Sequence, residues 1–374
     1  MRVLQVYKDY FPILGGIEGH LRLLAEGMVA RGHQVTVLTS GRGRRGEVRE
    51  IGGVRVIYAG RMATLASAPV SPALLAHMAR QRPDIVHLHM PDPTGDMALA
   101  LAGPRAPLVV SYHSDIVRQR RLLRLYAPLL RRTLRRASRI IAASPAYIQS
   151  SPFLAPLAER CAVMPYGIDL ARFARPNPAK VAAIRARYPG PLALFVGRLR
   201  YYKGVDQLVR AMAHAPGRAL IIGADATVRR ADLERLAREV GVAERVHFLS
   251  VEDDHELVDY YHAADLFVLP SVERSEAFGI VQIEAQAAGL PVVATELGTG
   301  TSYVTLHGQT GIIVPPADHL ALARAIQAIM GSQTLARTMG EAGRRRAHAE
   351  FSLPRMLDRA EALYAEALRA NVEC

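Results

Sequence analysis

Short apolar runs alternate with amphipathic segments of helical length along the whole chain. Runs rich in valine, isoleucine and leucine predict strands, and longer segments with a period near 3.6 residues predict helices. The predicted strands form two series, at residues 3–7, 34–39, 54–58, 84–90, 108–112, 139–142 and 161–165, and then at 192–196, 218–222, 246–249, 266–269 and 291–294. Because strands separated by helices are typical of βαβ units, the expected fold class is α/β with parallel sheets.

A proline-rich passage separates the two series. It reads R-P-N-P at 175–178 and is followed by a short helical segment that ends at Pro189-Gly190. The chain has 374 residues, about twice a typical domain, and 50% of them are hydrophobic, enough for two cores. We therefore expect a first domain at 1–170, a second at 171–350, and a C-terminal helix within 351–374.

The charge of the chain limits its partners. The formal net charge is +13, but only three of the 47 basic residues are lysines, so the arginine excess partly reflects genome composition. A membrane surface or a phosphorylated ligand could supply the negative partner, and because no DNA- or RNA-binding motif accompanies the charge, nucleic acid is not expected. Two cysteines cannot form a disulfide framework, and the opening M-R-V-L-Q-V-Y is a strand pattern rather than a signal peptide, so we expect a cytoplasmic protein.

The most basic stretch runs from Arg118 to Arg139. No acidic residue occurs from 116 to 158, and the spacing predicts a basic amphipathic helix that could kink at Pro128. Its apolar positions are Leu122, Leu125, Leu129 and Leu134. Two interpretations stay open: a helix that contacts anionic lipid headgroups from the inner face of the membrane, or one packed on its own sheet with a solvated arginine face.

Two glycine-rich segments have different interpretations. Gly15-Gly16 follows the first strand and precedes a helix expected at about 17–31, so the backbone there can approach a ligand and the helix N-terminus favours an anion. The segment 41–46 matches G-x-G-x-x-G letter for letter, but a dinucleotide fingerprint needs a following helix and an acidic residue about twenty positions on. A strand is expected at 54–58 instead, so we interpret 41–46 as an exposed arginine-rich loop.

Clusters of potential metal ligands do not predict a metal. His87 and His89 share one strand face and His113 ends the next strand, but no nearby carboxylate completes a site. The acidic run at 252–256 is more typical of the first turn of a helix, where negative charge complements the macrodipole. We therefore expect no metal and no other cofactor.

Charged residues follow two strands of the second series. Arg198 and Lys203 come after the strand at 192–196, and this pairing suits phosphate oxygens, because arginine binds through a planar fork and lysine as a point charge. Glu276 lies in the loop after the strand at 266–269, and Glu284 is expected two turns inside the next helix. Both carboxylates can then face the crevice above the strand ends, where open α/β sheets bind ligands.

Five motifs agree in order and spacing with a known family. They are G-G-I-E-G-H at 15–20, Y-H-S-D at 112–115, M-P-Y-G-I-D at 164–169, V-G-R-L-R-Y-Y-K-G at 196–204 and E-A-F-G-I-V-Q-I-E at 276–284. Together they resemble family 4 of the glycosyltransferases over essentially the whole chain. The resemblance implies the GT-B fold, with two Rossmann-like domains facing across a cleft and a C-terminal helix that crosses back to the first. It also implies a retaining, metal-independent transfer from a nucleotide sugar.

The resemblance implies roles for these residues. Gly15 and Gly16 would approach the donor diphosphate, while Arg198 and Lys203 would clamp it and stabilise the leaving group. Among the other catalytic positions, His113 would contact the transferred sugar and Glu276 would hold its hydroxyls. Glu284 would hold the ribose, and the donor cradle would be completed by the backbone at Phe278, Gly279 and Ile280.

The segment E-L-G-T-G-T-S-Y-V at 296–304 departs from the G-G-x-x-E pattern that is common in the family after this strand. It resembles bacterial mannosyltransferases that use GDP-mannose to build polysaccharides, so mannose transfer to a glycan or lipid-linked acceptor is favoured. The alternatives are the same reaction with a UDP- or ADP-sugar, and a non-catalytic nucleotide-binding protein of the same fold. An oxidoreductase is disfavoured because the glycine fingerprint is missing.

Overall fold

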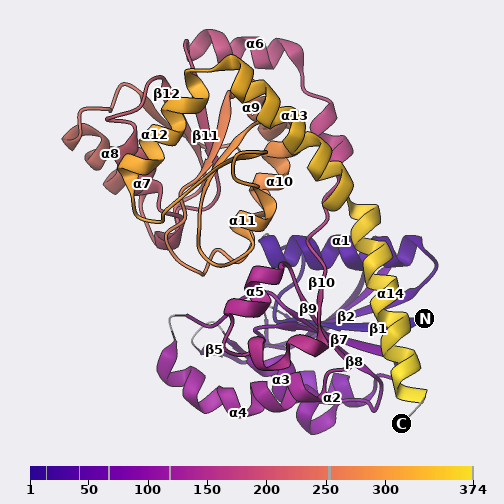
Figure 1. The fold of residues 1–374 in the computed structure, drawn as a ribbon. Helices are drawn as coiled ribbons and strands as arrows, with labels where there is room; N and C mark the ends of the chain where they lie inside the picture. Colours follow the sequence, from indigo (N-terminus) through magenta and orange to yellow (C-terminus); the bar gives the residue numbers. More distant parts are fainter. Residues whose placement is uncertain (14, 42, 66–67, 118, 252–253, 373–374) are drawn as a thin grey trace. The chain divides into compact units, whose positions relative to one another are not determined.

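The computed structural model describes residues 1–374 except 14, 42, 66–67, 118, 252–253 and 373–374. Its contacts divide the chain into two compact units (Figure 1). The first comprises Met1–Gly167 together with Leu353–Cys374, and the second comprises Ile168–Ser352. Each unit has its own sheet with helices on both faces, as the alternating pattern predicts.

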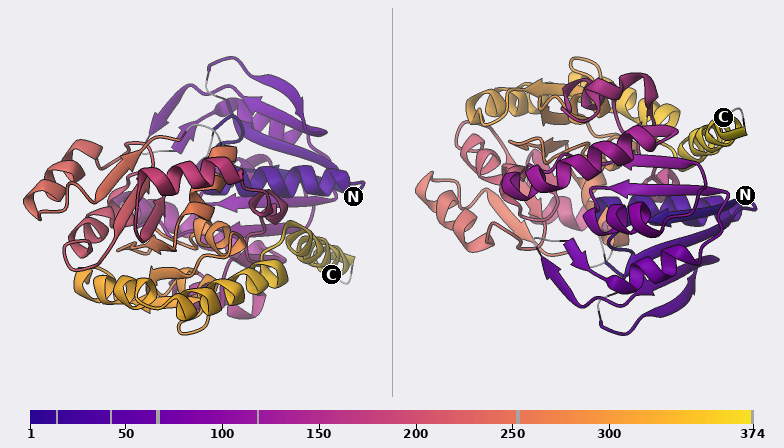
Figure 2. Two further views of the ribbon diagram at one scale, coloured as in Figure 1. Left: turned by 90° about the horizontal axis from the view of Figure 1, so that it is seen from above. Right: turned by 90° about the horizontal axis from the view of Figure 1, so that it is seen from below.

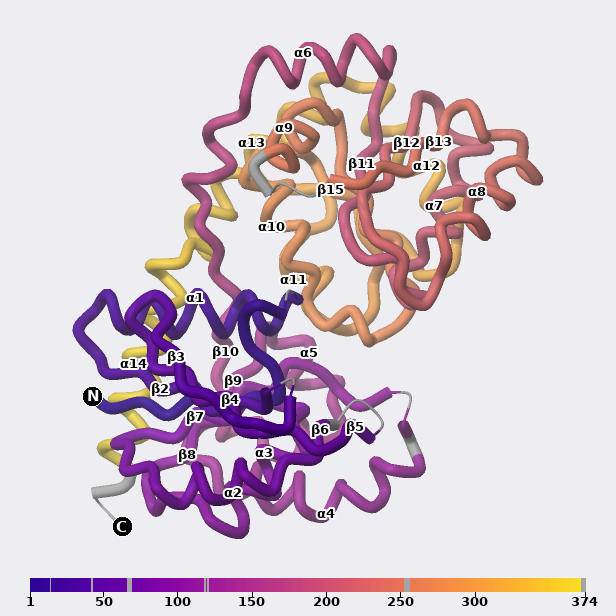
Figure 3. Tube along the Cα trace, turned by 180° about the vertical axis from the view of Figure 1, so that it is seen from behind, coloured from indigo at the N-terminus to yellow at the C-terminus, as the bar shows by residue number. Residues whose placement is uncertain are grey.

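The first unit is built on an eight-stranded sheet in the order β10-β9-β8-β7-β1-β2-β4-β3. Every pairing is parallel except that of β3 with β4, which is antiparallel at the edge, and β5 and β6 form a separate small hairpin (Figure 3). The strands are β1(Arg2–Val6), β2(Gln34–Ser40), β3(Glu47–Ile51), β4(Val54–Ala59), β5(Ala63–Leu65), β6(Ala68–Val70), β7(Ile85–Met90), β8(Leu108–Tyr112), β9(Arg139–Ala142) and β10(Cys161–Val163).

The C-terminal helix completes the core of this unit. The helices are α1(Gly16–Ala30), α2(Pro72–Ala79), α3(Pro93–Ala102), α4(Arg120–Arg136), α5(Pro145–Ser150) and α14(Leu353–Val372), with 3-10 turns η1(Ala155–Arg160) and η2(Leu170–Ala174), the latter in the second unit. Met356 and Tyr364 of α14 are buried in one cluster with Leu24 of α1 and Val37 of β2. Arg31, at the end of α1, forms ion pairs with Asp358 and Glu361 of α14. The N-terminus and the end of α14 lie on the same side of the first unit (Figures 1 and 2).

Helix α4 runs without interruption through Pro128. It buries Ala127, Leu130 and Leu134, but Leu122 and Leu125 are 44% and 80% exposed. The leucine spacing therefore predicts only part of the buried face, because α4 packs against α3 through its C-terminal half.

The second unit is built on a six-stranded parallel sheet in the order β13-β12-β11-β14-β15-β16. Its strands are β11(Leu192–Val196), β12(Arg218–Ile222), β13(Val246–Leu249), β14(Leu266–Leu269), β15(Val292–Thr295) and β16(Gly311–Val314). Its helices are α6(Pro178–Arg187), η3(Tyr201–Lys203), α7(Val205–Ala211), α8(Arg230–Glu239), α9(Asp254–Ala263), α10(Ile280–Ala287), α11(Thr301–Val304), α12(His319–Met330) and α13(Gln333–Glu350).

The strand order reverses once in each sheet, and the position of the reversal predicts where each sheet binds a ligand. In the second unit the chain moves outward from β11 to β12 and β13, then returns to β14 and moves the other way, so the reversal lies between β11 and β14. In the first unit it lies between β1 and β7. Open α/β sheets bind ligands at the carboxyl ends of the strands beside such a reversal.

Most sequence-predicted strands are confirmed within two residues, and the four missed are short or at an edge. They are β3, β5, β6 and β16. The segment 41–46 is followed by β3 and not by a helix, which confirms that it is no dinucleotide fingerprint; residue 42 lies outside the described residues. Residues 254–256 of the acidic run are the first residues of α9, as predicted, and 252–253 lie outside the described residues.

Candidate active site

Two loops meet beside the strand reversal of the second unit. The first, residues 197–204, follows β11, and the second, residues 270–279, follows β14. The backbone N–H of Val272 donates to the carbonyl of Tyr202 at 2.8 Å and ties the loops together. The predicted phosphate-binding residues and Glu276 thus come from adjacent loops at one sheet edge.

Lys203 and Glu276 form an ion pair at this edge. Lys203 Nζ lies 2.5 Å from Glu276 Oε2, with the two side chains 12% and 9% exposed. Ser271 Oγ also donates to the same carboxylate oxygen, at 3.2 Å. A nearly buried pair of this kind holds two opposite charges where a ligand with anionic phosphates and donor hydroxyls could take over both partners.

The glycine at position 204 is required by the contact between the loops. Its φ of +62° is left-handed, and a Cβ there would lie 2.1 Å from the carbonyl oxygen of Pro270. Gly279 also has a positive φ, +80°, and precedes the first turn of α10 with no side-chain cap on the N–H groups of that turn. The helix N-terminus is therefore open to an anion or a hydroxyl.

The segment 296–304, singled out from the sequence for its departure from the family pattern, supports the 276–279 loop. Thr299 Oγ1 donates to the carbonyl of Glu276 at 2.8 Å, and the N–H of Gly300 donates to the carbonyl of Ala277 at 2.8 Å. Gly300 has no room for a side chain, because a Cβ would lie 2.3 Å from Phe278 Cδ2. Sequence reasoning missed these supporting roles, although the unusual segment was their signal.

The remaining predicted donor residues of this unit lie on the same two elements. Arg198 is an exposed residue of the first loop, and Phe278 is buried behind the second. Ile280 begins α10, so Glu284 lies about one turn inside the helix and not two as expected. Its carboxylate accepts from the hydroxyl of Tyr261 at 2.7 Å, which fixes its orientation.

In the first unit, Gly15 and Gly16 lie where the sequence places them. Gly15 is an exposed N-cap with extended backbone, and Gly16 is the exposed first residue of α1. Gly15 has no side chain with which to cap the first N–H groups of α1, and the carboxylate of Glu18, in the first turn of the helix, lies beside it. His113 follows β8 and is buried, with both ring nitrogens already hydrogen-bonded, to Tyr166 and to His89.

His113 belongs to a cluster of buried histidines. Burial lowers the pKa of His20 and of His87 to about 3, and it lowers the pKa values of His89 and His113 well below the ordinary range. Ring nitrogens of His20, His89 and His113 lie within 4.8 Å of one another, the one group of metal-ligand type found among the residues described. His89 and His113 already bond each other through facing nitrogens, so a metal remains no part of our expectation.

Two family models together match most of the chain. Residues 14–172 match the model of "Glycosyltransferase Family 4", and residues 180–346 match that of "Glycosyl transferases group 1". The chain is a family 4 glycosyltransferase. It is therefore an enzyme that transfers sugars, and neither an oxidoreductase nor a non-catalytic protein.

Relatives match this glycosyltransferase over nearly its whole length. It is 37% identical to D-rhamnosyltransferase WbpZ of Pseudomonas aeruginosa, covering 91% of this chain and 89% of the relative. It is 34% identical to O-antigen chain mannosyltransferase C of Escherichia coli, covering 99% and 100%. The solved sucrose-phosphate synthase of Thermosynechococcus elongatus superposes with a TM-score of 0.83 at 26% identity, covering 99% of each chain, and the fold is GT-B.

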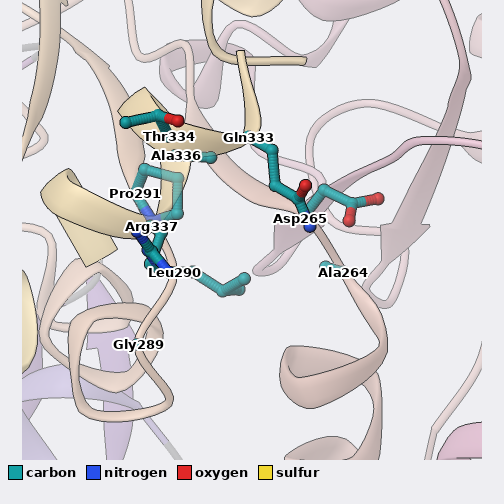
Figure 4. Close-up of a pocket in the computed structure, with 9 residues that line it drawn as sticks. All are labelled: Ala264, Asp265, Gly289, Leu290, Pro291, Gln333, Thr334, Ala336 and Arg337. Atoms are coloured by element: carbon teal, nitrogen blue, oxygen red, sulfur yellow. The ribbon is translucent and has the colours of Figure 1, made fainter. Parts of the chain in front are cut away.

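The glycosyltransferase also has a pocket of about 440 Å³ away from the candidate site (Figure 4). It is lined by the residues that precede β14 and β15 and by the start of α13, with Asp265 and Arg337 on opposite sides. This is the amino end of the strands, opposite the edge where the two loops meet. It therefore lies apart from the candidate donor-binding edge.

Replacing Gly204 by alanine should separate the two loops. The new Cβ clashes with a backbone oxygen, so we expect transfer to fall at least ~10-fold and stability to fall by more than the ~1 kcal/mol that a left-handed alanine costs. Gly241→Ala is the matched control, because Gly241 has a similar φ of +74° with open space around it. Thermal melting and kcat/KM of both variants check this; equal activity of the two would show that the loop contact is not needed.

Proposed function

We propose that this glycosyltransferase moves a hexose of manno configuration, with GDP-mannose as the favoured donor, to a glycan or lipid-linked acceptor during polysaccharide synthesis, with retention at the anomeric carbon. The observation that carries the proposal is that two relatives covering more than nine-tenths of the chain are named for such sugars. D-rhamnose is 6-deoxymannose, so both names describe the same ring configuration. The segment 296–304 adds the resemblance to GDP-mannose enzymes.

The proposed chemistry uses the Lys203–Glu276 pair. When the donor enters, Lys203 turns its charge to the diphosphate while Glu276 accepts from sugar hydroxyls, so each exchanges one partner for another. Arg198 adds a second cation, and the N-terminus of α10 offers N–H groups for negative charge. Stabilisation of the leaving nucleoside diphosphate then comes from the protein without a metal. Glu284, held by Tyr261, binds the ribose.

A donor screen tests the proposal. Purified enzyme is incubated with GDP-mannose, GDP-glucose, UDP-glucose and ADP-glucose, and released nucleoside diphosphate is measured with and without lipid-linked glycan acceptor. We expect GDP-mannose to be preferred by at least ~10-fold, since a site built for a sugar hydroxyl discriminates strongly. Preference for a UDP- or ADP-sugar would refute the donor assignment, and product NMR that shows inversion would refute retention.

We also propose that α4 brings the enzyme to an anionic membrane surface, where a lipid-linked acceptor would be found. The exposed Leu122 and Leu125 lie among arginines that are also exposed: Arg121, Arg124, Arg131, Arg132, Arg135 and Arg136. Apolar side chains beside cationic ones are typical of helices that bind at the interface of anionic lipids. No helix in the described part of the chain is long and apolar enough to cross a bilayer.

Vesicle sedimentation tests this surface. The Arg121→Gln/Arg124→Gln/Leu125→Gln variant should lose at least ~10-fold in affinity for vesicles with anionic lipid, since each cation near such a surface contributes about 1 kcal/mol. The matched control is Arg229→Gln/Arg235→Gln, two exposed arginines of the second unit, one at the N-cap of α8 and one within it. Equal binding of the native enzyme to neutral and anionic vesicles would remove the electrostatic basis.

A further inference from the structure

The buried ring of His113 is the middle of a hydrogen-bonded chain. Its Nδ1 lies 2.7 Å from the hydroxyl of Tyr166, and its Nε2 lies 2.9 Å from Nδ1 of His89. The three rings are stacked in sequence, with 8° between the planes of His89 and His113 and 27° between those of His113 and Tyr166. Both ring nitrogens and the ring plane are thus fixed by the protein.

The direction of these hydrogen bonds follows from the acidity of the groups. An imidazole nitrogen is a stronger base than a phenol oxygen, and a phenol is a stronger acid than a neutral imidazole N–H, so Tyr166 donates to Nδ1 of His113. A neutral imidazole carries one proton, so the proton of His113 is on Nε2 and is donated to His89. His89 then carries its own proton on Nε2, an atom that has no other partner in the described part of the protein.

His20 is a further buried histidine beside this hydrogen-bonded chain. Both of its ring nitrogens are buried and lack partners among the described residues, and its ring lies 4.6 Å from that of Tyr166. One ring nitrogen of His20 lies within 4.8 Å of one nitrogen each of His89 and His113. The other titratable groups around His113 are Tyr7, whose ring packs edge-on at 6.4 Å, and His87, stacked on His89.

We propose that Tyr166, with His89 behind it, is a positioning residue that fixes the tautomer of His113 and keeps this imidazole neutral during sugar transfer. The inference rests on the proposed function and on the contact with the transferred sugar that the family resemblance implies for His113. Protonation of His113 places a proton on Nδ1, so the Tyr166 hydroxyl must turn from donor to acceptor at this contact and direct its own proton to another partner. A positive ring would also oppose the positive charge that develops on the sugar as the nucleotide departs.

Tyr166→Phe tests this inference because it removes one oxygen and keeps the ring that packs on His20. We expect the Nδ1 signal of His113, read by ¹⁵N NMR of histidine-labelled protein, to lose its hydrogen-bonded shift and to titrate at higher pH than in the native enzyme. The pH profile of kcat/KM, measured over the range in which both proteins stay folded, should gain an acid limb of about tenfold per pH unit that the native enzyme lacks there. Thermal melting confirms that the variant is folded.

Tyr364→Phe is the matched control. Its hydroxyl bonds Nδ1 of His87 at the same distance, 2.7 Å, in the same core, but it does not belong to the His113 chain. It should change the His87 signals and leave the His113 signals and the pH profile as they are.

Unchanged His113 signals in Tyr166→Phe would overturn the inference. Changed signals with a flat pH profile would also overturn it, because Tyr166 would then hold a ring without consequence for transfer. Both results leave the proposed function standing, since that depends on the donor preference of the native enzyme, which is measured separately.

Discussion

Lys203→Met is expected to abolish sugar transfer and to destabilise the second unit, although Glu276 is untouched. The variant leaves a carboxylate that is 9% exposed without the ammonium that lies 2.5 Å from it. Removing one partner of a buried ion pair costs about 3 kcal/mol or more, because the other charge stays uncompensated. The lost cation should also cost at least ~10³-fold in kcat/KM, the scale of a removed electrostatic contact to a leaving group.

The double variant Lys203→Met/Glu276→Gln separates the two effects. With both charges gone, most of the lost stability should return, since neutral side chains of similar size often replace a buried pair without cost. Activity should not return, because the diphosphate still lacks its cation and the sugar its carboxylate. Glu276→Gln alone keeps shape and should also be inactive.

Urea unfolding and donor turnover measured on all three variants check the expectation. Lys180→Met is the control for a lysine of the same unit that lies at the start of α6 and away from both loops. If the double variant transferred mannose at the native rate, the pair would be structural and the site assignment wrong.

Acidification to about pH 5 is expected to unfold the first unit before the second. Burial holds the pKa values of His20 and His87 at about 3, while an unfolded histidine has a pKa near 6.5. Below pH 6.5 the unfolded chain therefore binds more protons than the folded one, and stability falls as pH falls. At pH 5 each of these two histidines lowers the free energy of unfolding by about 2 kcal/mol, and the two together lower it by about 4 kcal/mol.

Other groups modify this sum. His89 and His113 act in the same direction, since burial also lowers their pKa values. Asp92 acts in the opposite direction, because burial raises its pKa to about 6. At pH 5 the folded state therefore binds more protons at this group than the unfolded state, which adds about 1 kcal/mol to the free energy of unfolding. We therefore expect the free energy of unfolding to fall by several kcal/mol in the first unit, which contains the buried histidines, and not in the second.

Urea titrations near pH 7.5 and pH 5, followed by pulsed hydrogen–deuterium labelling of peptides from each unit, measure this loss. His20→Phe should reduce the pH dependence by about 2 kcal/mol, because it removes one titrating group that has no hydrogen bonds to break among the described residues. His348→Gln, at an exposed site on α13, should leave it unchanged. Parallel loss of stability in both units would contradict the assignment to the histidine cluster.

The sequence alone determined the parts that depend on local pattern. Apolar runs and helical periods placed most strands within two residues, because both signals are carried by neighbouring positions. The motifs after the predicted strands placed Arg198, Lys203 and Glu276 at strand ends, and parallel strands direct their carboxyl ends to one edge. Family membership follows from the same motifs.

The tertiary structure decided which of these residues meet. Lys203 and Glu276 are 73 positions apart and Tyr166 and His113 are 53 apart, so their contacts depend on strand order and loop conformation, which no local period encodes. The same holds for the edge strands β3 and β16 and for α4, whose exposed leucines show that periodicity predicts a face but not what covers it. The partners of His113 became visible only when β7, β8 and the segment after β10 were packed together, because hydrogen bonds between distant residues depend on the fold of the whole unit.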